Sequence, residues 1–94
     1  MLATTPIDLS KVSSDNINKE VLRLGIIAEL DAVNLYEQLA ENATDHNVKK
    51  VLLDIAGEEK EHVGEFKKLL HMLDKEQIEM ENNGAKEVEE LLKE

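Results

Sequence analysis

The sequence contains no cysteine and no tryptophan, a single proline, four glycines and only two aromatic side chains, Tyr36 and Phe66. Without cysteine, the chain can form neither disulfides nor thiolate metal sites. No stretch approaches the roughly 20 apolar residues that cross a bilayer. The first residues have neither the basic start nor the apolar run of a secretory signal. We therefore expect a soluble, cytoplasmic protein.

Basic residues are also scarce, because 11 lysines and arginines face 21 aspartates and glutamates, for a formal net charge of −10. This sign repels phosphate backbones and anionic lipids. Two aromatic side chains are too few for a platform on which bases stack. We expect neither a nucleic-acid nor a membrane partner. The charge favours cations as ligands, although a solvated acidic surface explains it equally well.

The pattern of apolar and polar residues predicts an all-α fold in one small domain. Residues 1–14 read as a flexible N-terminal arm. Helices are expected over about 16–42 and 46–73, followed by a short third helix that ends near the "NNG" of 82–84. A helical domain over 15–82 and a C-terminal tail or linker over 83–94 follow from these boundaries, and "AKEVEELLKE" at 85–94 reads either as one more helical piece or as a mobile tail. Two long helices and a short turn make an antiparallel hairpin, whose apolar stripes need a second copy to cover them.

Residues that favour helix starts support these boundaries. The serines and aspartate of 13–15 are candidate N-caps for the first helix, and Thr44 or Asp45 for the second. Asp74 followed three residues later by Gln77 is typical of a capping box at the start of the third. "NNG" is typical of a helix C-terminus.

Polar residues interrupt the apolar face of both long helices at one level. Steps of four and three along the second helix give Val48, Leu52, Ile55, Glu59, His62, Phe66, Leu69 and Leu73. On the first helix they give Leu22, Ile26, Glu29, Val33, Tyr36, Ala40 and Ala43. Glu29 lies about 16 positions before a turn near residue 45, and Glu59 and His62 lie about 14 and 17 after it. An antiparallel hairpin therefore brings Glu29, Glu59 and His62 together.

Buried carboxylates without a cation are costly, and no lysine or arginine lies on either face near this level. Two carboxylates and an imidazole are ligands for hard-to-intermediate metals. Di-iron carboxylate bundles use one Glu from each of two helices and a Glu-x-x-His pair from each of the other two. This chain supplies half of that set, so a homodimer completes it. Four carboxylates balance two divalent ions, which favours a pair of irons over one zinc.

At this point the sequence resembles the encapsulated ferritin family, the half-length ferritins that work inside encapsulin shells. The matching stretches are "AELDAVNLYEQ" at 28–38 and "EEKEH" at 58–62. The likeness covers about residues 16–80, with the turn in register. It implies a half-ferritin domain that dimerises into a ferritin-like four-helix bundle and assembles further into a decameric ring of dimers.

The resemblance also implies an activity and roles for residues. The family's ferroxidases oxidise Fe(II) to Fe(III) at a di-iron site, two irons per dimer, and feed iron storage inside an encapsulin nanocompartment. The catalytic and metal-binding positions match Glu29, Glu59 and His62. Tyr36 matches a tyrosine beside that centre, and Asp31 matches an acidic position on the route by which iron enters. The shell protein is the implied partner, and no cofactor besides iron is implied.

Two other interpretations remain open for the same residues. A non-enzymatic helical module could be stapled into an oligomer by zinc or calcium. An acidic scaffold could oligomerise through its apolar faces alone, with Glu59 and His62 as part of a solvated helix face. Plain packing is the commoner role for Tyr36, and a surface position for Asp31. His46 and His71 have no second ligand at a usable spacing, so we expect both to face solvent.

Overall fold

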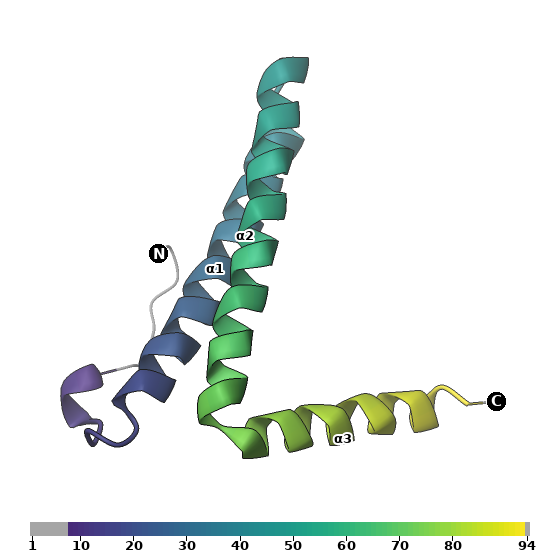
Figure 1. Cartoon of the computed structure of the whole chain (residues 1–94). Helices are drawn as coiled ribbons and strands as arrows, with labels where there is room; N and C mark the ends of the chain where they lie inside the picture. Colours follow the sequence, from purple (N-terminus) through teal and green to yellow (C-terminus); the bar gives the residue numbers. More distant parts are fainter. Residues whose placement is uncertain (1–7, 94) are drawn as a thin grey trace.

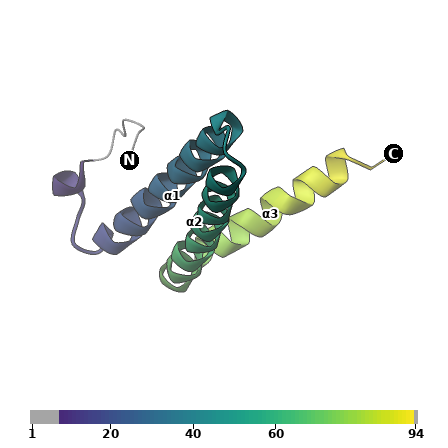
Figure 2. The ribbon, with the colours of Figure 1, turned by 90° about the horizontal axis from the view of Figure 1, so that it is seen from above.

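The computed structural model describes residues 8–93, and every regular element in this range is a helix. A short 3-10 turn, η1 (Leu9–Lys11), precedes three helices: α1 (Ile17–Asn42), α2 (His46–Leu73) and α3 (Lys75–Leu91). Helices α1 and α2 form an antiparallel hairpin, and α3 turns sharply away from its open end (Figure 1). Seen from above, α3 extends to one side of the hairpin (Figure 2). The predicted all-α hairpin with a third helix is confirmed, and no strand occurs within residues 8–93.

Local capping explains two of the helix starts. The Asp45 carboxylate accepts a hydrogen bond from the backbone N–H of Val48 at 2.9 Å, as expected for the start of α2. Asp74 accepts one from the N–H of Gln77 at 3.2 Å at the start of α3. The prediction for α1 was wrong, because Asn16 holds the N-cap position and its side chain makes no capping bond. Its amide instead donates to the Ser13 hydroxyl at 3.2 Å.

The third helix is longer than the sequence predicted. Helix α3 runs for 17 residues through "NNG" to Leu91, so the predicted helix end near 82–84 was wrong. A C-terminal cap at glycine or asparagine uses a left-handed backbone, and no residue of the described chain has a positive φ. Strong helix formers after Gly84 outweigh the roughly 1 kcal/mol that glycine costs. The described part of the predicted N-terminal arm contains η1, and residues 1–7 lie outside the described residues.

The hairpin core is small. Its buried apolar residues are Leu22, Val33, Ala40, Ala56 and Leu70. Two of them are alanines, which bury little apolar area. Many large apolar side chains of the described chain stay half exposed, and no charged side chain there is fully buried. Among the described residues no helix combines the length and apolar character that a membrane span requires.

Polar contacts attach α3 to the hairpin. Glu81 receives three donors: Lys67 at 2.9 Å, His71 at 2.6 Å and Gln77 at 3.0 Å. These partners lower the pKa of Glu81 to about 2, with His71 contributing most. The expectation that His71 faces solvent without a partner was therefore wrong. Because the folded-state pKa is lowered, the contribution of Glu81 to stability is present above about pH 4.5 and is lost as the pH falls towards 2.

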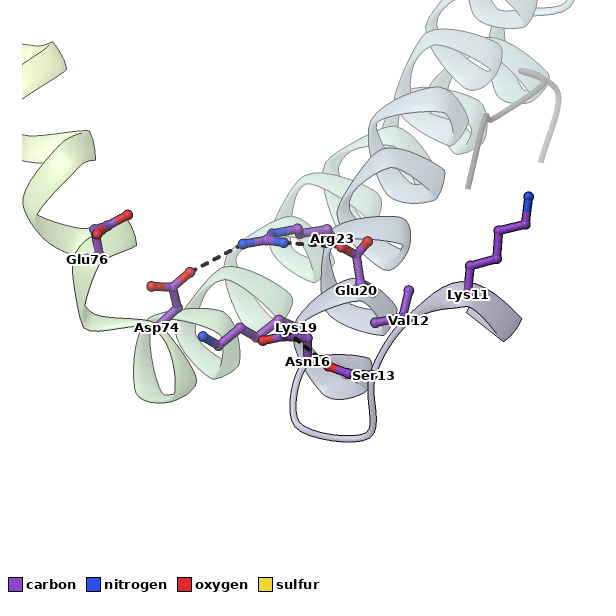
Figure 3. A pocket seen from close by; sticks show the side chains of 9 residues that line it. All are labelled: Lys11, Val12, Ser13, Asn16, Lys19, Glu20, Arg23, Asp74 and Glu76. Carbon is purple, nitrogen blue, oxygen red and sulfur yellow. Dashed lines mark hydrogen bonds and ion pairs between the residues drawn. The ribbon is translucent and has the colours of Figure 1, made fainter. Parts of the chain in front are cut away.

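A second polar contact joins the base of α3 to α1. Arg23 reaches Glu20 at 3.4 Å and Asp74, the residue between α2 and α3, at 3.3 Å. Figure 3 shows Arg23 bridging the two carboxylates at the edge of a hollow of about 660 Å³ between η1, α1 and the α2–α3 junction. Half-exposed ion pairs contribute little each, so the direction of α3 depends on the Glu81 and Arg23 contacts together.

We expect Glu81→Ala to loosen α3 while leaving the hairpin folded. The lost contacts to Lys67 and His71 of α2, at about 0.5 kcal/mol each for partly exposed pairs, should lower the local opening free energy of α3 by about 1 kcal/mol. Hydrogen exchange measured by mass spectrometry should then accelerate by roughly fivefold in α3 and hardly at all in the buried turns of α1 and α2. Glu79→Ala, an exposed position on the same helix, is the control. Equal exchange in the two variants would contradict this role of Glu81.

Candidate metal centre

Three side chains from the two long helices meet halfway along the hairpin. Glu29 lies near the middle of α1, and Glu59 and His62 lie one turn apart on α2. His62 Nδ1 is 3.3 Å from Glu29 Oε2 and 3.3 Å from Glu59 Oε2. One ligand atom from each residue falls within 4.8 Å of the others. The structure thus brings together the three residues that the sequence register placed at one level.

The three side chains differ in their access to solvent. The Glu29 and Glu59 side chains are 19% and 20% exposed, whereas that of His62 is 43% exposed. The carboxylates therefore lie between α1 and α2, and the imidazole lies at the open side of the cluster. His62 is the only cationic partner that the structure gives either carboxylate among the described residues. Two partly buried acids that share one imidazole are well placed to attract a metal cation.

Protonation of the cluster is strongly coupled. The pKa of Glu29 is raised, because it hydrogen-bonds to Glu59 and is partly desolvated. The pKa of Glu59 is lowered, because it accepts from Glu29 and from His62. The two carboxyl groups therefore titrate as a pair. The pKa of His62 is raised, first by its hydrogen bond to Glu59 and then by Glu29.

The donor set fits a divalent metal but does not enclose one. Two carboxylates and one imidazole offer oxygen and nitrogen ligands suited to iron, zinc or manganese. Iron in carboxylate bundles takes more ligands than three side chains supply, and the missing half is a second Glu and a second Glu-x-x-His pair. The chain therefore presents one group of three possible ligands, open on the side of His62.

Exposed apolar side chains lie on the same face of α2 as His62, about two and three turns away from it. Positions 7 and 11 residues away lie within about 20° of His62 around a helix. Val51, Leu69 and Leu73 occupy such positions, and each is about half exposed. Leu69 and Leu73 line an apolar hollow of about 250 Å³ together with Val21 of α1. The face of α2 that carries His62 thus has exposed apolar side chains towards both ends of the helix.

The structure does not bring Tyr36 or Asp31 into this cluster. Tyr36 follows Glu29 by seven residues on the same face of α1, about 10 Å along the helix towards the turn. Asp31 is half buried, and two residues turn a helix by about 200°, so it lies on a different face of α1 from Glu29. The predicted roles of Tyr36 beside the centre and of Asp31 on an iron route remain predictions.

Comparison with known proteins identifies the family. A family model described as Rubrerythrin matches residues 20–93, which include Glu29, Glu59 and His62. This chain belongs to the rubrerythrin family. The structure is similar to a crystal structure of the encapsulated ferritin domain from Pyrococcus furiosus, with a TM-score of 0.83 and 51% identity over 98% of this chain and 96% of that one. The resemblance that the sequence motifs indicated is confirmed.

Curated relatives of this rubrerythrin-family chain are larger proteins. The chain is 61% identical over 72 residues to the ferritin-like-encapsulin shell fusion protein of Pyrococcus furiosus, which covers 77% of this chain and 21% of that protein. It is 41% identical over 56 residues to the encapsulin nanocompartment cargo protein EncC of Myxococcus xanthus, covering 60% and 43%. The chain therefore spans about a fifth of the fusion protein and less than half of EncC.

Metal affinity should rise with pH, because a metal must displace the protons that the cluster retains. Glu29 and His62 both have raised pKa values, so we expect the Kd for Co²⁺ to fall above about pH 4.5 and again above about pH 6.5. Isothermal titration at a series of pH values tests this. His62→Ala should remove the upper step, and Glu61→Gln, an exposed neighbour, should keep both. A Kd that is the same at pH 5 and pH 8 would contradict the displacement of protons from the cluster by the metal.

Stability of the metal-free protein should change in the opposite direction. The raised pKa of His62 contributes stability that is complete below about pH 6.5 and is lost as the pH rises through the folded-state value. Thermal unfolding of the chelator-treated protein should therefore give a lower Tm at pH 8.5 than at pH 6. His62→Ala should flatten this dependence.

Proposed function

We propose that this chain is a ferroxidase that oxidises Fe(II) to Fe(III) at a di-iron site shared by two copies of the chain. The observation that carries the proposal is the convergence of Glu29, Glu59 and His62, with no lysine or arginine of residues 8–93 paired to the carboxylates. Each chain supplies a lone Glu and a Glu-x-x-His pair. Two chains supply the full ligand set of a di-iron carboxylate bundle.

The exposed apolar side chains on the His62 face of α2 support a second copy as the partner. An isologous dimer has a two-fold axis, and an axis through the cluster and perpendicular to the helices reverses the direction of the partner's helices. The turn end of the partner, with Leu39 and Val51, would then cover the hollow beside Leu69. Leu39 and Val51 are 45% and 57% exposed in the single chain, and Leu69 is 48% exposed. The same contact would close the open side of His62.

Each ligand has a distinct part in the proposed reaction. Glu59 is the candidate for a carboxylate that would ligate both irons, and it lies in one ligand group with Glu29 and His62. Glu29 is the candidate for a terminal oxygen ligand, and His62 for one nitrogen per iron. Iron is the substrate: two Fe(II) ions give one electron each to dioxygen, which with two protons yields hydrogen peroxide and two Fe(III) ions. The protein contributes ligand geometry and negative charge that stabilises the more highly charged product.

Relatives give this activity a setting. Proteins named as encapsulin cargo, and a fusion to an encapsulin shell, match most of the helical part of this chain. We therefore propose that it works inside an encapsulin nanocompartment, with the shell protein as partner and with storage of the oxidised iron there. Assembly into a decameric ring of dimers, a role of Tyr36 beside the site and iron transit at Asp31 belong to the same proposal.

Aerobic addition of Fe(II) tests the activity. The wild-type protein should consume oxygen and develop ferric absorbance far faster than buffer alone. Glu59→Ala, His62→Ala and Glu29→Ala should each lower the initial rate by about 100-fold or more, because each removes two ligands from a dimer. Glu58→Ala and Glu61→Ala, exposed neighbours on α2, should keep the wild-type rate.

The same assay separates the two rival interpretations. A zinc- or calcium-stapled module would bind metal with the same three residues but would not speed oxygen consumption. An acidic scaffold would lose neither metal uptake nor assembly in Glu59→Ala. A wild-type rate equal to the buffer rate would refute the ferroxidase proposal.

A further inference from the structure

Gly25 has a packing contact that distinguishes it from the chain's other glycines. A Cβ atom at Gly25 would lie 3.4–3.5 Å from three ring carbons of Phe66, whereas one at Gly57, Gly64 or Gly84 would meet nothing within 4 Å. The Phe66 ring of α2 therefore lies directly against the backbone of α1. Glycine weakens a helix interior relative to alanine. At Gly25 the helix accepts this cost at the position where the Phe66 ring packs against it.

This contact lies in the layer next to the metal-ligand cluster. Gly25 precedes Glu29 by four residues, and Phe66 follows His62 by four. Residues four apart share a helix face and lie about one turn from each other. The Gly25–Phe66 pair thus lies one helical turn from the metal-ligand cluster, on the side away from the α1–α2 turn. Gly25 is on α1 and Phe66 is on α2, the two helices that carry the ligands.

We propose that Phe66, seated on Gly25, is a positioning residue for the metal site, an inference that rests on the proposed function. Its ring fills the space one turn beyond His62, which restricts the rotamers of the imidazole. As an apolar wall it also keeps water from that side of the carboxylates, and attraction between carboxylate and cation strengthens when water is excluded. Gly25 allows the ring to lie this close to α1.

Cobalt binding tests the proposal without depending on turnover. Co²⁺ alone would be titrated into the full chain, and both the Kd and the visible absorption spectrum of the bound ion would be recorded. Phe66→Ala should raise the Kd about tenfold and alter the spectrum, because the imidazole loses its fixed orientation. Phe66→Leu, which keeps part of the wall, should fall between the two.

Substitutions at Gly25 test whether the metal site depends on the position of the Phe66 ring or only on its presence. Gly25→Ala places a methyl group at ordinary contact distance and should keep the wild-type Kd. Gly25→Leu must push the ring aside and should raise the Kd about tenfold, with the matching spectral change. Gly64→Leu adds the same side chain in open space on α2 and should have no effect. In a Phe66→Ala background, Gly25→Leu should cost nothing more, because the leucine occupies the vacated space.

Helicity measured by circular dichroism confirms that each variant is folded before titration. Folded Phe66→Ala and Gly25→Leu proteins with the wild-type Kd and spectrum would overturn the inference and leave the proposed function standing. A wild-type chain that binds no Co²⁺ would refute the shared metal site itself, and this inference with it.

Discussion

The central constraint on this molecule is a pair of carboxylates held between two helices, with one imidazole of the described residues as their cationic partner. Glu29 and Glu59 are each about one-fifth exposed, and their hydrogen bond raises the pKa of Glu29 and lowers that of Glu59. Such a pair costs free energy in an apolar seam unless a cation joins it. The hairpin holds the two acids together, because Glu29 lies on α1 and Glu59 on α2.

The small core and the open side of the site both belong to a hairpin of only two long helices. Few apolar side chains are buried inside one chain, and others, such as Val51 and Leu69 on the face of His62, stay about half exposed. A second copy that covers this face would supply the missing apolar burial and the missing ligands at once. In that arrangement metal binding and association stabilise each other.

Much of this arrangement could be predicted from the sequence, because it depends on local periodicity and on counting residues from one turn. The positions of Glu29, Glu59 and His62 relative to residue 45 placed them at one level, and the turn itself was marked by Asp45. The course of α3 could not be predicted in this way. "NNG" stops a helix only if the backbone turns left-handed, which local sequence does not decide. The contact of His71 with Glu81 then depends on the direction of α3, and so it was missed.

The most direct measurement is diffraction at the iron absorption edge from a crystal grown with Fe(II). A di-iron site shared by two copies predicts two anomalous peaks for each pair of chains, and both peaks lie between the copies. Each peak should be within bonding distance of a carboxylate oxygen and of one His62 nitrogen. A single peak enclosed by one chain, or peaks only on the outer acidic surface with Glu29, Glu59 and His62 turned to solvent, would contradict it.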